Sequence, residues 1–256
     1  MRLIILNPTA IVKPCLEKSA EKHIQQGNCY CVFDSSQLNE FSPEMLSPDY
    51  WQQQQAIEGS AQGRGTTYFI KHQEQHWVLR HYYRGGLMGK LNKDSYFFTG
   101  VNNTRAAKEF QLLVTMKKLG LPAPQAIAYR VIKKGLFYHA DLLSSRIENA
   151  QDLVAILQQQ ALTEKTWFEI GAMIKCFHQQ GIYHHDLNSH NILLDQQNKP
   201  WLIDFDRGEQ RVIDKSWQEN NLARLLRSFK KEQVKIKHFQ WQEKNWQQLL
   251  NGYQSL

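Results

Sequence analysis

The sequence predicts an α+β fold of two lobes, in which a β-rich N-terminal part with one main helix precedes a short helical C-terminal part. Two patterns support this prediction. In the N-terminal part, short runs of alternating apolar and polar residues, separated by turn residues, indicate antiparallel strands. In the C-terminal part, apolar residues recur at spacings of three and four, as on the buried face of a helix. The pattern changes near Leu143, so we expect an N-terminal extension and β-rich lobe at 1–143 and a helical lobe at 144–256, together forming one unit.

The N-terminal elements follow from the turn residues that separate the apolar runs. Four glycines in residues 84–100 predict an exposed loop. Gly120, followed by Pro122, predicts the end of the main helix. We expect two strands around a glycine-bearing loop at 59–65, with strands at 66–71 and 76–82. The loop at 84–100 and the helix at 103–119 come next. Two more strands are expected at 126–131 and 135–143.

The C-terminal elements combine long helices with short strands. Trp167, Ile170, Ile174 and Phe177 fall at helical spacing and predict one buried helix face. Short apolar runs on either side of a polar turn predict a pair of strands. The expected helices are 150–158, 162–180, 217–229 and 241–250, and the expected strands are 191–194 and 201–203.

The composition fits a soluble globular protein with a basic surface. The 256 residues are 42% apolar, and a formal net charge of +7 favours polyanionic partners such as nucleotide phosphates, nucleic acid or anionic lipid head groups. The four cysteines are too few for a disulfide framework, and Cys29-x-Cys31 lacks the second pair that a zinc site needs. No segment approaches the ~18 unbroken apolar residues of a membrane span. Any contact with a membrane is therefore expected from one side.

Two short motifs carry the chemistry of the chain. Residues 184–191 read His-His-Asp-Leu-Asn-Ser-His-Asn, and residues 203–206 read Ile-Asp-Phe-Asp. They resemble the protein kinase catalytic loop, His-Arg-Asp-Leu-x-x-x-Asn, and the metal-binding Asp-Phe-Gly that follows it. His185 stands in place of the arginine, and Asp206 stands in place of the glycine. Their order, their spacing and the helix, loop, strand, strand context together predict a protein-kinase-like fold.

Phosphoryl transfer explains why these residue types occur together. The reaction needs a carboxylate beside the attacking hydroxyl and oxygen ligands for Mg²⁺ at the phosphates of ATP. Asp186 is the expected catalytic residue, which orients the acceptor hydroxyl and accepts its proton. Asn191 and Asp204 are the expected metal ligands. Asp206 is expected to add a further ligand or an outer-sphere contact.

The glycine-bearing loop is the expected phosphate contact in the N-terminal lobe. Its glycines and Ala61 fall at alternate positions, which departs from Gly-x-Gly-x-x-Gly. Backbone amides of such a loop can lie against phosphate oxygens. Gly63 and Gly65 are the positions we expect to do so.

The strand that follows is expected to supply a cation for the nucleotide. Alternation along residues 77–80 places Arg80 where the kinase Val-Ala-Ile-Lys strand carries its lysine. The planar guanidinium of an arginine can bind phosphate oxygens in a bidentate manner. Glu109, on the main helix, is expected to pair with Arg80 as the kinase helix glutamate pairs with the lysine. Lys71 and Lys90 are fallback cations.

A longer resemblance narrows the acceptor. Several segments resemble the 3-deoxy-D-manno-octulosonic acid (Kdo) kinases of Gram-negative bacteria, relatives of the heptose kinases of the lipopolysaccharide core. The segments that carry the resemblance are 59–66, 78–91, 184–191 and 202–206. Arg-Gly-Gly-x-x-Gly-Lys at 84–90 is the most distinctive of them. Within that family, Arg80 and Asp206 match the pattern.

The resemblance implies transfer of the γ-phosphate of ATP to the 4-hydroxyl of the Kdo sugar on a lipid A precursor, at the cytoplasmic face of the inner membrane. A basic surface is compatible with peripheral contact with an anionic membrane, at roughly 1 kcal/mol for each Lys or Arg close to it. Arg84 and Lys90 are the candidates for contacting the acceptor. Residues 1–50 either extend the first sheet or cover the acceptor site. Neither nucleic acid nor an obligate protein partner is expected.

Four alternatives remain open at this point. A glycosyltransferase would use Asp204 and Asp206 for a metal, but it leaves 184–191 unexplained. A small-molecule kinase would share every motif and differ only in its acceptor. A nucleotide-binding pseudokinase would keep the fold without turnover, although the intact Asp186, Asn191 and Asp204 argue against it. A nucleic-acid binder would need a basic patch, and the basic run at 224–237 is interpreted instead as a solvated helix face or as attraction to a membrane.

Overall fold

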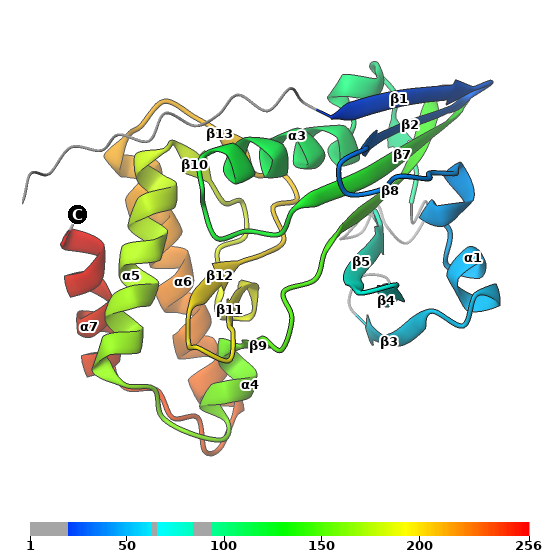
Figure 1. The fold of residues 1–256 in the computed structure, drawn as a ribbon. Helices are drawn as coiled ribbons and strands as arrows, with labels where there is room; N and C mark the ends of the chain where they lie inside the picture. Colours follow the sequence, from blue (N-terminus) through cyan, green and yellow to red (C-terminus); the bar gives the residue numbers. More distant parts are fainter. Residues whose placement is uncertain (1–19, 63–65, 84–93, 256) are drawn as a thin grey trace, which may run out of the picture.

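The structure is a computed structural model that describes residues 20–62, 66–83 and 94–255. Within these residues, a large sheet with helix α3 against it forms one part of the molecule (Figure 1). Helices α5, α6 and α7 lie together in the other part, with the short strands β11 and β12 between the two. This arrangement confirms the expected α+β architecture with a β-rich N-terminal lobe and a helical C-terminal lobe.

The large sheet is antiparallel, with the strand order β1-β2-β7-β8-β5-β4-β3 and with β6 paired to β8. Its strands are β1 (Glu21–Gln26), β2 (Cys29–Asp34), β3 (Ile57–Gln62), β4 (Thr66–His72), β5 (Gln75–His81), β6 (Tyr96–Phe97), β7 (Ala126–Lys134) and β8 (Phe137–Ser145). The expected strands are present, but residues 59–62 of the expected glycine-bearing loop belong to β3, and residues 96–97 of the loop expected at 84–100 form β6. Of the two possibilities for residues 1–50, the described part shows the first, because β2 pairs with β7 and extends the sheet.

One face of the sheet is covered by helix α3 (Arg105–Lys118), which confirms the main helix expected there. Thr104 caps the helix by accepting a hydrogen bond from the Ala107 amide. Phe110 and Met116 are fully buried beneath it. A short 3-10 helix, η2 (Val101–Asn103), leads into α3. The buried face of α3 therefore fixes the position of Glu109 relative to the strands.

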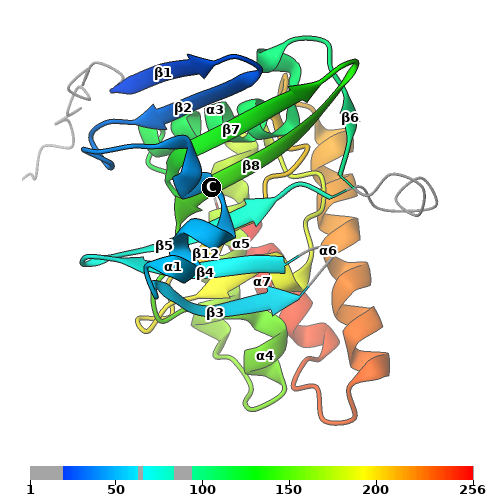
Figure 2. The same ribbon diagram turned by 90° about the vertical axis from the view of Figure 1, so that its right-hand side faces the viewer.

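The other face of the sheet packs against the segment between β2 and β3. This segment forms the 3-10 helix η1 (Pro43–Leu46) and helix α1 (Pro48–Gln53). Trp51 is buried there, its ring 5.8 Å from that of Trp77 on β5, and its Nε1 donates to the Met45 backbone oxygen at 2.6 Å. Figure 2 shows α1 beside strands β3 to β5. Because both faces are covered, the strands that carry the site are held from two sides.

The C-terminal lobe consists of helices that surround short strands. The helices are α4 (Leu153–Leu157), α5 (Glu164–Gln179), α6 (Lys215–Lys235) and α7 (Glu243–Gln254), with the 3-10 helix η3 (Ser189–Asn191). The strands are β9 (Gln151–Asp152), β10 (Ile182–Tyr183), β11 (Ile192–Leu194), β12 (Pro200–Leu202) and β13 (Glu209–Gln210). Helix α4 is shorter than the sequence predicts, because Asp152 caps it and residues 151–152 pair with β11.

A short segment connects the last strand of the large sheet to the first strand of the C-terminal part. Strand β8 continues past Leu143 to Ser145, and β9 begins at Gln151. We propose that the lobes are joined by the segment 146–150. None of the helices in the described parts of the chain is long and apolar enough to cross a membrane.

Helices α5 and α7 pack so closely that two glycines are required at their contact. A Cβ atom on Gly171 would overlap the backbone oxygen of Leu249, and one on Gly252 would overlap the backbone oxygen of Phe168. Backbone atoms cannot move aside as the end of a side chain can. The position of α7 against α5 therefore depends on the absence of a side chain at both sites.

We expect Gly171→Ala to lower the free energy of unfolding by about 1–3 kcal/mol, because the added methyl group must push α7 away from α5. Chemical denaturation measures this change. Lys165→Ala is the matched control on α5, since the Lys165 side chain is 84% exposed; a shift within ~0.5 kcal/mol is expected there. An unfolding free energy for Gly171→Ala equal to that of the wild type would contradict the close helix contact.

Candidate active site

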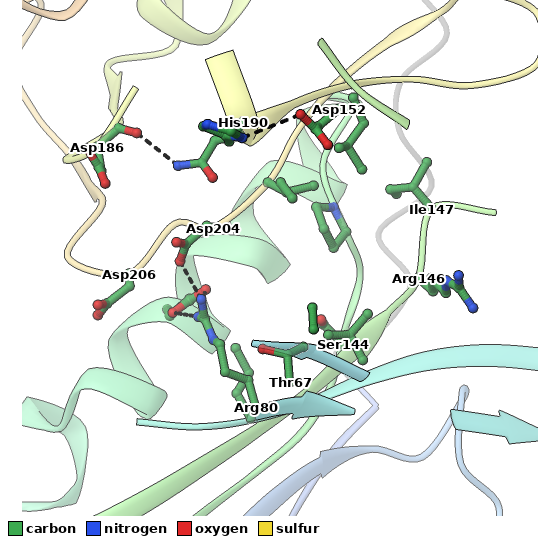
Figure 3. A pocket seen from close by; sticks show the side chains of 18 of the residues that line it. Thr67, Arg80, Ser144, Arg146, Ile147, Asp152, Asp186, His190, Asp204 and Asp206 are labelled. Carbon is green, nitrogen blue, oxygen red and sulfur yellow. Dashed lines mark hydrogen bonds and ion pairs between the residues drawn. The ribbon is translucent and has the colours of Figure 1, made fainter. Parts of the chain in front are cut away.

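A cleft with a volume of about 880 Å³ lies between the sheet and the C-terminal lobe. Apolar side chains line both walls, with Val78 and Leu142 on the sheet side and Leu193 and Ile203 on the other. Six residues singled out in the sequence also line it: Arg80, Glu109, Asp186, Asn191, Asp204 and Asp206. Figure 3 shows several of these side chains pointing toward one another. The fold therefore brings together groups from both halves of the chain.

Four of the predicted positions, Gly63, Gly65, Arg84 and Lys90, lie outside the described residues. Their predicted contacts with ATP or the acceptor remain predictions. Strands β3 and β4, which flank residues 63–65 in the sequence, contribute cleft-lining residues such as Ala61 and Thr67. Lys71, a fallback cation, is exposed on β4 and is not among the residues that line the cleft.

Arg80 connects the sheet to Glu109, its expected partner, and also to Asp204, which was not expected to pair with it. Its Nη2 donates to Oε1 of Glu109 on α3 at 2.5 Å, and its Nη1 donates to the Asp204 carboxylate. The predicted ion pair between Arg80 and Glu109 is therefore present. Burial opposes the charge of this guanidinium, but the carboxylates of Glu109 and Asp204 hold the pKa of Arg80 well above its usual value. Arg80 is cationic at the centre of the cleft.

Glu109 is held by a second group besides Arg80. Its side chain is only 4% exposed, and its Oε2 accepts a hydrogen bond from the Tyr82 hydroxyl at 2.6 Å. Tyr82 directly follows β5, two residues after Arg80, and both side chains contact Glu109 on α3. A buried carboxylate is tolerated only when it is paired and hydrogen-bonded. The two contacts meet that requirement and fix the orientation of Arg80.

The loop that carries Asp186 is organised by the buried His184. The His184 Nε2 donates to the Ile203 backbone oxygen at 2.9 Å, and its Nδ1 accepts the backbone amide of Asp186 at 3.2 Å. Burial lowers the pKa of His184, so the ring is neutral, with one donor and one acceptor nitrogen. Asn221 on α6 donates to the His184 backbone oxygen at 3.0 Å. His184 thus positions Asp186 and ties its loop to the strand before Asp204.

Asn191 lies next to Asp186 in the same loop. Its Nδ2 donates to the Asp186 backbone oxygen at 2.9 Å, which leaves the amide oxygen Oδ1 as an acceptor. Asn188 caps η3, accepting the backbone amides of His190 and Asn191 on its side-chain oxygen. The loop therefore holds a carboxylate and an amide oxygen in fixed relation to each other.

Arg224 is a site residue that the sequence did not single out. From helix α6, its Nε and Nη2 donate to Oδ1 of Asp186 at 2.9 and 2.5 Å. The side chains are 46% and 34% exposed, so solvent weakens the pair. The interpretation of residues 224–237 as a solvated or membrane-facing run is incomplete for Arg224. Its only signal in the sequence was membership of that basic run.

Asp204 and Asp206 follow strand β12 and differ in their surroundings. Asp204 has a φ angle of 61°, a left-handed backbone conformation that is uncommon outside glycine and clusters at functional sites. Asp206 is paired with Arg105, the first residue of α3, whose Nε donates to Oδ1 at 2.7 Å and whose Nη2 forms an ion pair with Oδ2. Arg105 was also not predicted from the sequence. It joins α3 to the end of β12, as Arg80 joins β5 to Asp204.

The donor set of the cleft is suited to a polyphosphate and a hard divalent cation. The amide oxygen of Asn191 and the carboxylate of Asp204 are the oxygen ligands that Mg²⁺ prefers. Arg80 supplies positive charge for phosphate oxygens beside them. Asp186 offers a carboxylate for a hydroxyl group. The arrangement can therefore support transfer of a phosphoryl group to an alcohol.

Comparison with known proteins gives an independent result. The model of the lipopolysaccharide kinase (Kdo/WaaP) family matches residues 48–253. The chain is 46% identical over 239 residues to a 3-deoxy-D-manno-octulosonic acid kinase of Haemophilus influenzae (strain 86-028NP), covering 90% of this chain and 98% of that protein. It is 49% identical over 203 residues to the protein of the same name from Vibrio parahaemolyticus, covering 79% of this chain and 85% of that protein.

Proposed function

The chain belongs to the lipopolysaccharide kinase (Kdo/WaaP) family, and from this premise we propose that it transfers the γ-phosphate of ATP to the 4-hydroxyl of the Kdo sugar on a lipid A precursor. The observation that carries the proposal is the convergence of Asp186, Asn191, Asp204 and Arg80 on one cleft. Their types and order are those of a phosphotransferase that uses an alcohol as acceptor. The relatives named above bear the name of a Kdo kinase, which supports the choice of acceptor.

Asp186 is the proposed catalytic residue. Its carboxylate would accept a hydrogen bond from the sugar hydroxyl, orient it toward the phosphate and take its proton during transfer. Arg224 holds one carboxylate oxygen, Oδ1, so the other remains the better acceptor for the hydroxyl. The hydrogen bond from the Asp186 backbone amide to the His184 ring keeps the loop in place during the transfer.

Mg²⁺ fits the oxygen donors of Asn191 and Asp204, and when bound it would neutralise charge on the phosphates. We propose these two residues as its main ligands. Asp206 remains a proposed ligand, but both its oxygens face Arg105, so it would have to give up one of those contacts. Arg80, anchored by Glu109, is proposed to bind phosphate oxygens of ATP.

The apolar walls of the cleft are the proposed site of the adenine ring. Val78 from β5 and Leu193 from β11 lie on opposite walls, so a flat ring can be buried between them. Gly63 and Gly65 are proposed to contact the phosphates, and Arg84 and Lys90 are proposed to contact the anionic acceptor. These roles rest on the resemblance of the motifs.

A location at the cytoplasmic face of the inner membrane is proposed together with this acceptor. The net charge of +7 would favour peripheral contact with anionic lipid. The interaction would be electrostatic and weaken as salt is added. We propose no role for nucleic acid or for an obligate protein partner.

The importance of the Arg80 anchor can be tested with Glu109→Gln. We expect the KM for ATP to rise about tenfold, which corresponds to ~1.4 kcal/mol of lost binding, because Arg80 loses its buried counter-charge and turns toward Asp204. Steady-state kinetics at varied ATP measure this effect. Lys108→Ala, an exposed neighbour on α3, is the control and should leave KM unchanged. An unchanged KM in Glu109→Gln would show that Arg80 does not need this partner.

The acceptor and its position are tested by analysing the product. Wild-type protein is incubated with ATP, Mg²⁺ and a lipid A precursor carrying Kdo, and the phosphorylated lipid is examined by NMR. Phosphate on the 4-hydroxyl of Kdo supports the proposal. Phosphate at another hydroxyl would move the proposal to another position on the sugar. Phosphorylation of only non-Kdo alcohols would favour a kinase for a different acceptor class, and ATP binding without any product would favour a pseudokinase.

A further inference from the structure

Three potential metal ligands meet on the sheet, and none of them is among the residues proposed to act in phosphoryl transfer. They are His81 at the end of β5, His139 on β8, and Asp94, which precedes β6. One ligand atom from each lies within 4.8 Å of the other two. The Asp94 Oδ2 is 2.9 Å from the His139 Nδ1 and 3.3 Å from the His81 Nε2. Two imidazole nitrogens and one carboxylate oxygen therefore converge on a small volume.

This cluster lies on the face of the sheet opposite the Arg80 ion pair. Arg80 and Tyr82 point toward α3, where both contact Glu109. His81 stands between them in the strand and so points to the other face. There it contacts Asp141 of the neighbouring strand β8, which pairs with it directly. His81 also lines the cleft, but its contact with Asp141 lies on the opposite face of the strand from Arg80, and none of the three residues is a proposed magnesium ligand.

Both ring nitrogens of His81 face carboxylate oxygens, which can only accept hydrogen bonds. Its Nδ1 lies 2.7 Å from Oδ1 of the buried Asp141, while its Nε2 faces the Asp94 carboxylate. A neutral imidazole has only one N–H, so one of its nitrogens would present a lone pair to a carboxylate oxygen. Two acceptors at that distance repel each other unless a proton or a metal cation lies between them.

Asp141 is suited to orient His81 toward a metal. Its second oxygen, Oδ2, accepts from the Arg130 Nε at 2.9 Å, and Arg130 in turn donates to the backbone oxygens of Pro43 and Leu46. Asp141 is therefore fixed by the segment that covers this face. A carboxylate that holds one nitrogen of a ligating histidine, leaving the other for the metal, is a common outer-shell arrangement.

We propose that His81, Asp94 and His139 bind a divalent transition-metal ion, with zinc as the best match and water in the fourth position. Two imidazoles and a carboxylate are ligands that zinc accepts. The side chains are 25%, 35% and 16% exposed, respectively, so an ion and a water molecule can reach them. Since the histidines lie on the adjacent strands β5 and β8 and Asp94 directly precedes β6, the ion links Asp94 to both strands.

The test uses the full chain without a histidine tag, stripped with a chelator and titrated with zinc alone by calorimetry. We expect about one zinc ion per chain, a tetrahedral absorption spectrum when cobalt(II) replaces zinc, and a higher melting temperature with the metal. His139→Ala and Asp94→Asn should each weaken zinc binding by more than ~100-fold, while Asp141→Asn should weaken it by ~10–100-fold, as expected for an outer-shell partner.

Two controls separate this site from other binding. His23→Ala removes an exposed histidine on β1, and Asp204→Asn removes a proposed magnesium ligand; both should bind zinc as the wild type does. The absence of stoichiometric zinc binding would overturn the proposal and leave a protonated histidine–carboxylate network. Binding that survives both His139→Ala and Asp94→Asn would also overturn it, because the ion would then be held elsewhere.

Discussion

Replacing Asp186 with alanine is expected to lower kcat by about 10²–10⁴-fold, the range that a positioned general base contributes. The KM for ATP should change little, because Asp186 is proposed to contact the acceptor hydroxyl. Steady-state transfer to a Kdo-bearing lipid measures both quantities. Asp186→Asn tests the same role with the shape of the side chain kept. Its kcat should fall to a similar level, because an amide cannot take the proton.

Loss of Asp186 also leaves Arg224 without its partner. This pair is partly exposed, so the fold should tolerate the change and the melting temperature should stay close to that of the wild type. Asp49→Ala, on helix α1 away from the cleft, is the control for removal of a carboxylate. A kcat within about twofold of the wild type in Asp186→Ala would remove Asp186 from the proposed chemistry, since a general base is worth far more.

Replacing Asp204 with asparagine is expected to lower kcat/KM by more than the ~10–100-fold that loss of an outer-shell partner costs a metal site. Of the two main proposed ligands, Asp204 alone carries a charge. The amide oxygen of an asparagine attracts Mg²⁺ less strongly than a carboxylate does. The dependence of the rate on Mg²⁺ concentration measures the change. The Mg²⁺ concentration that gives half the maximal rate should rise strongly.

Asp206→Asn is the matched control for Asp204. Its carboxylate is engaged by Arg105, so the Mg²⁺ requirement should rise less than in Asp204→Asn. Equal shifts in the two variants would make Asp206 a full ligand, as the motif suggests. If the Mg²⁺ titration of Asp204→Asn matched that of the wild type, Asp204 would not be a metal ligand.

The sequence predicted the parts of the site that depend on local order. The spacing from Asp186 to Asn191 is set by a single loop, and Asp204 follows the short strands β11 and β12, so two neighbouring motifs contain all three. Arg80 was reachable through the two-residue alternation of a strand, and Glu109 through its place on the main helix. Each of these inferences needs only local geometry and a known scaffold.

The partners that the sequence did not reveal are set by tertiary packing. Arg224 reaches Asp186 from α6, 38 positions along the chain, and Arg105 reaches Asp206 across 101 positions. An arginine on a helix surface has no local mark that distinguishes a site residue from a solvated charge. The same limit applies to His81 on β5, His139 on β8 and Asp94, which precedes β6.

The N-terminal residues illustrate a different limit. Strands β1 and β2 are six residues each; β1 is polar except for Ile24 and β2 is apolar except for Asp34, so neither alternates. What stabilises β2 is pairing with β7, a strand about 100 residues later in the sequence. The possibility that residues 1–50 extend the sheet could be stated from the sequence, but only the pairing decided it for the described residues.

The proposed reaction transfers the terminal phosphate of ATP to a Kdo-bearing lipid. The most direct test incubates the wild-type protein with Mg²⁺, the lipid acceptor and ATP labelled at either the γ- or the α-phosphate. We expect label in the lipid from γ-labelled ATP alone, incorporated at a rate about 10²–10⁴-fold lower with Asp186→Ala. Label from α-labelled ATP, or no label from the γ-phosphate, would contradict it.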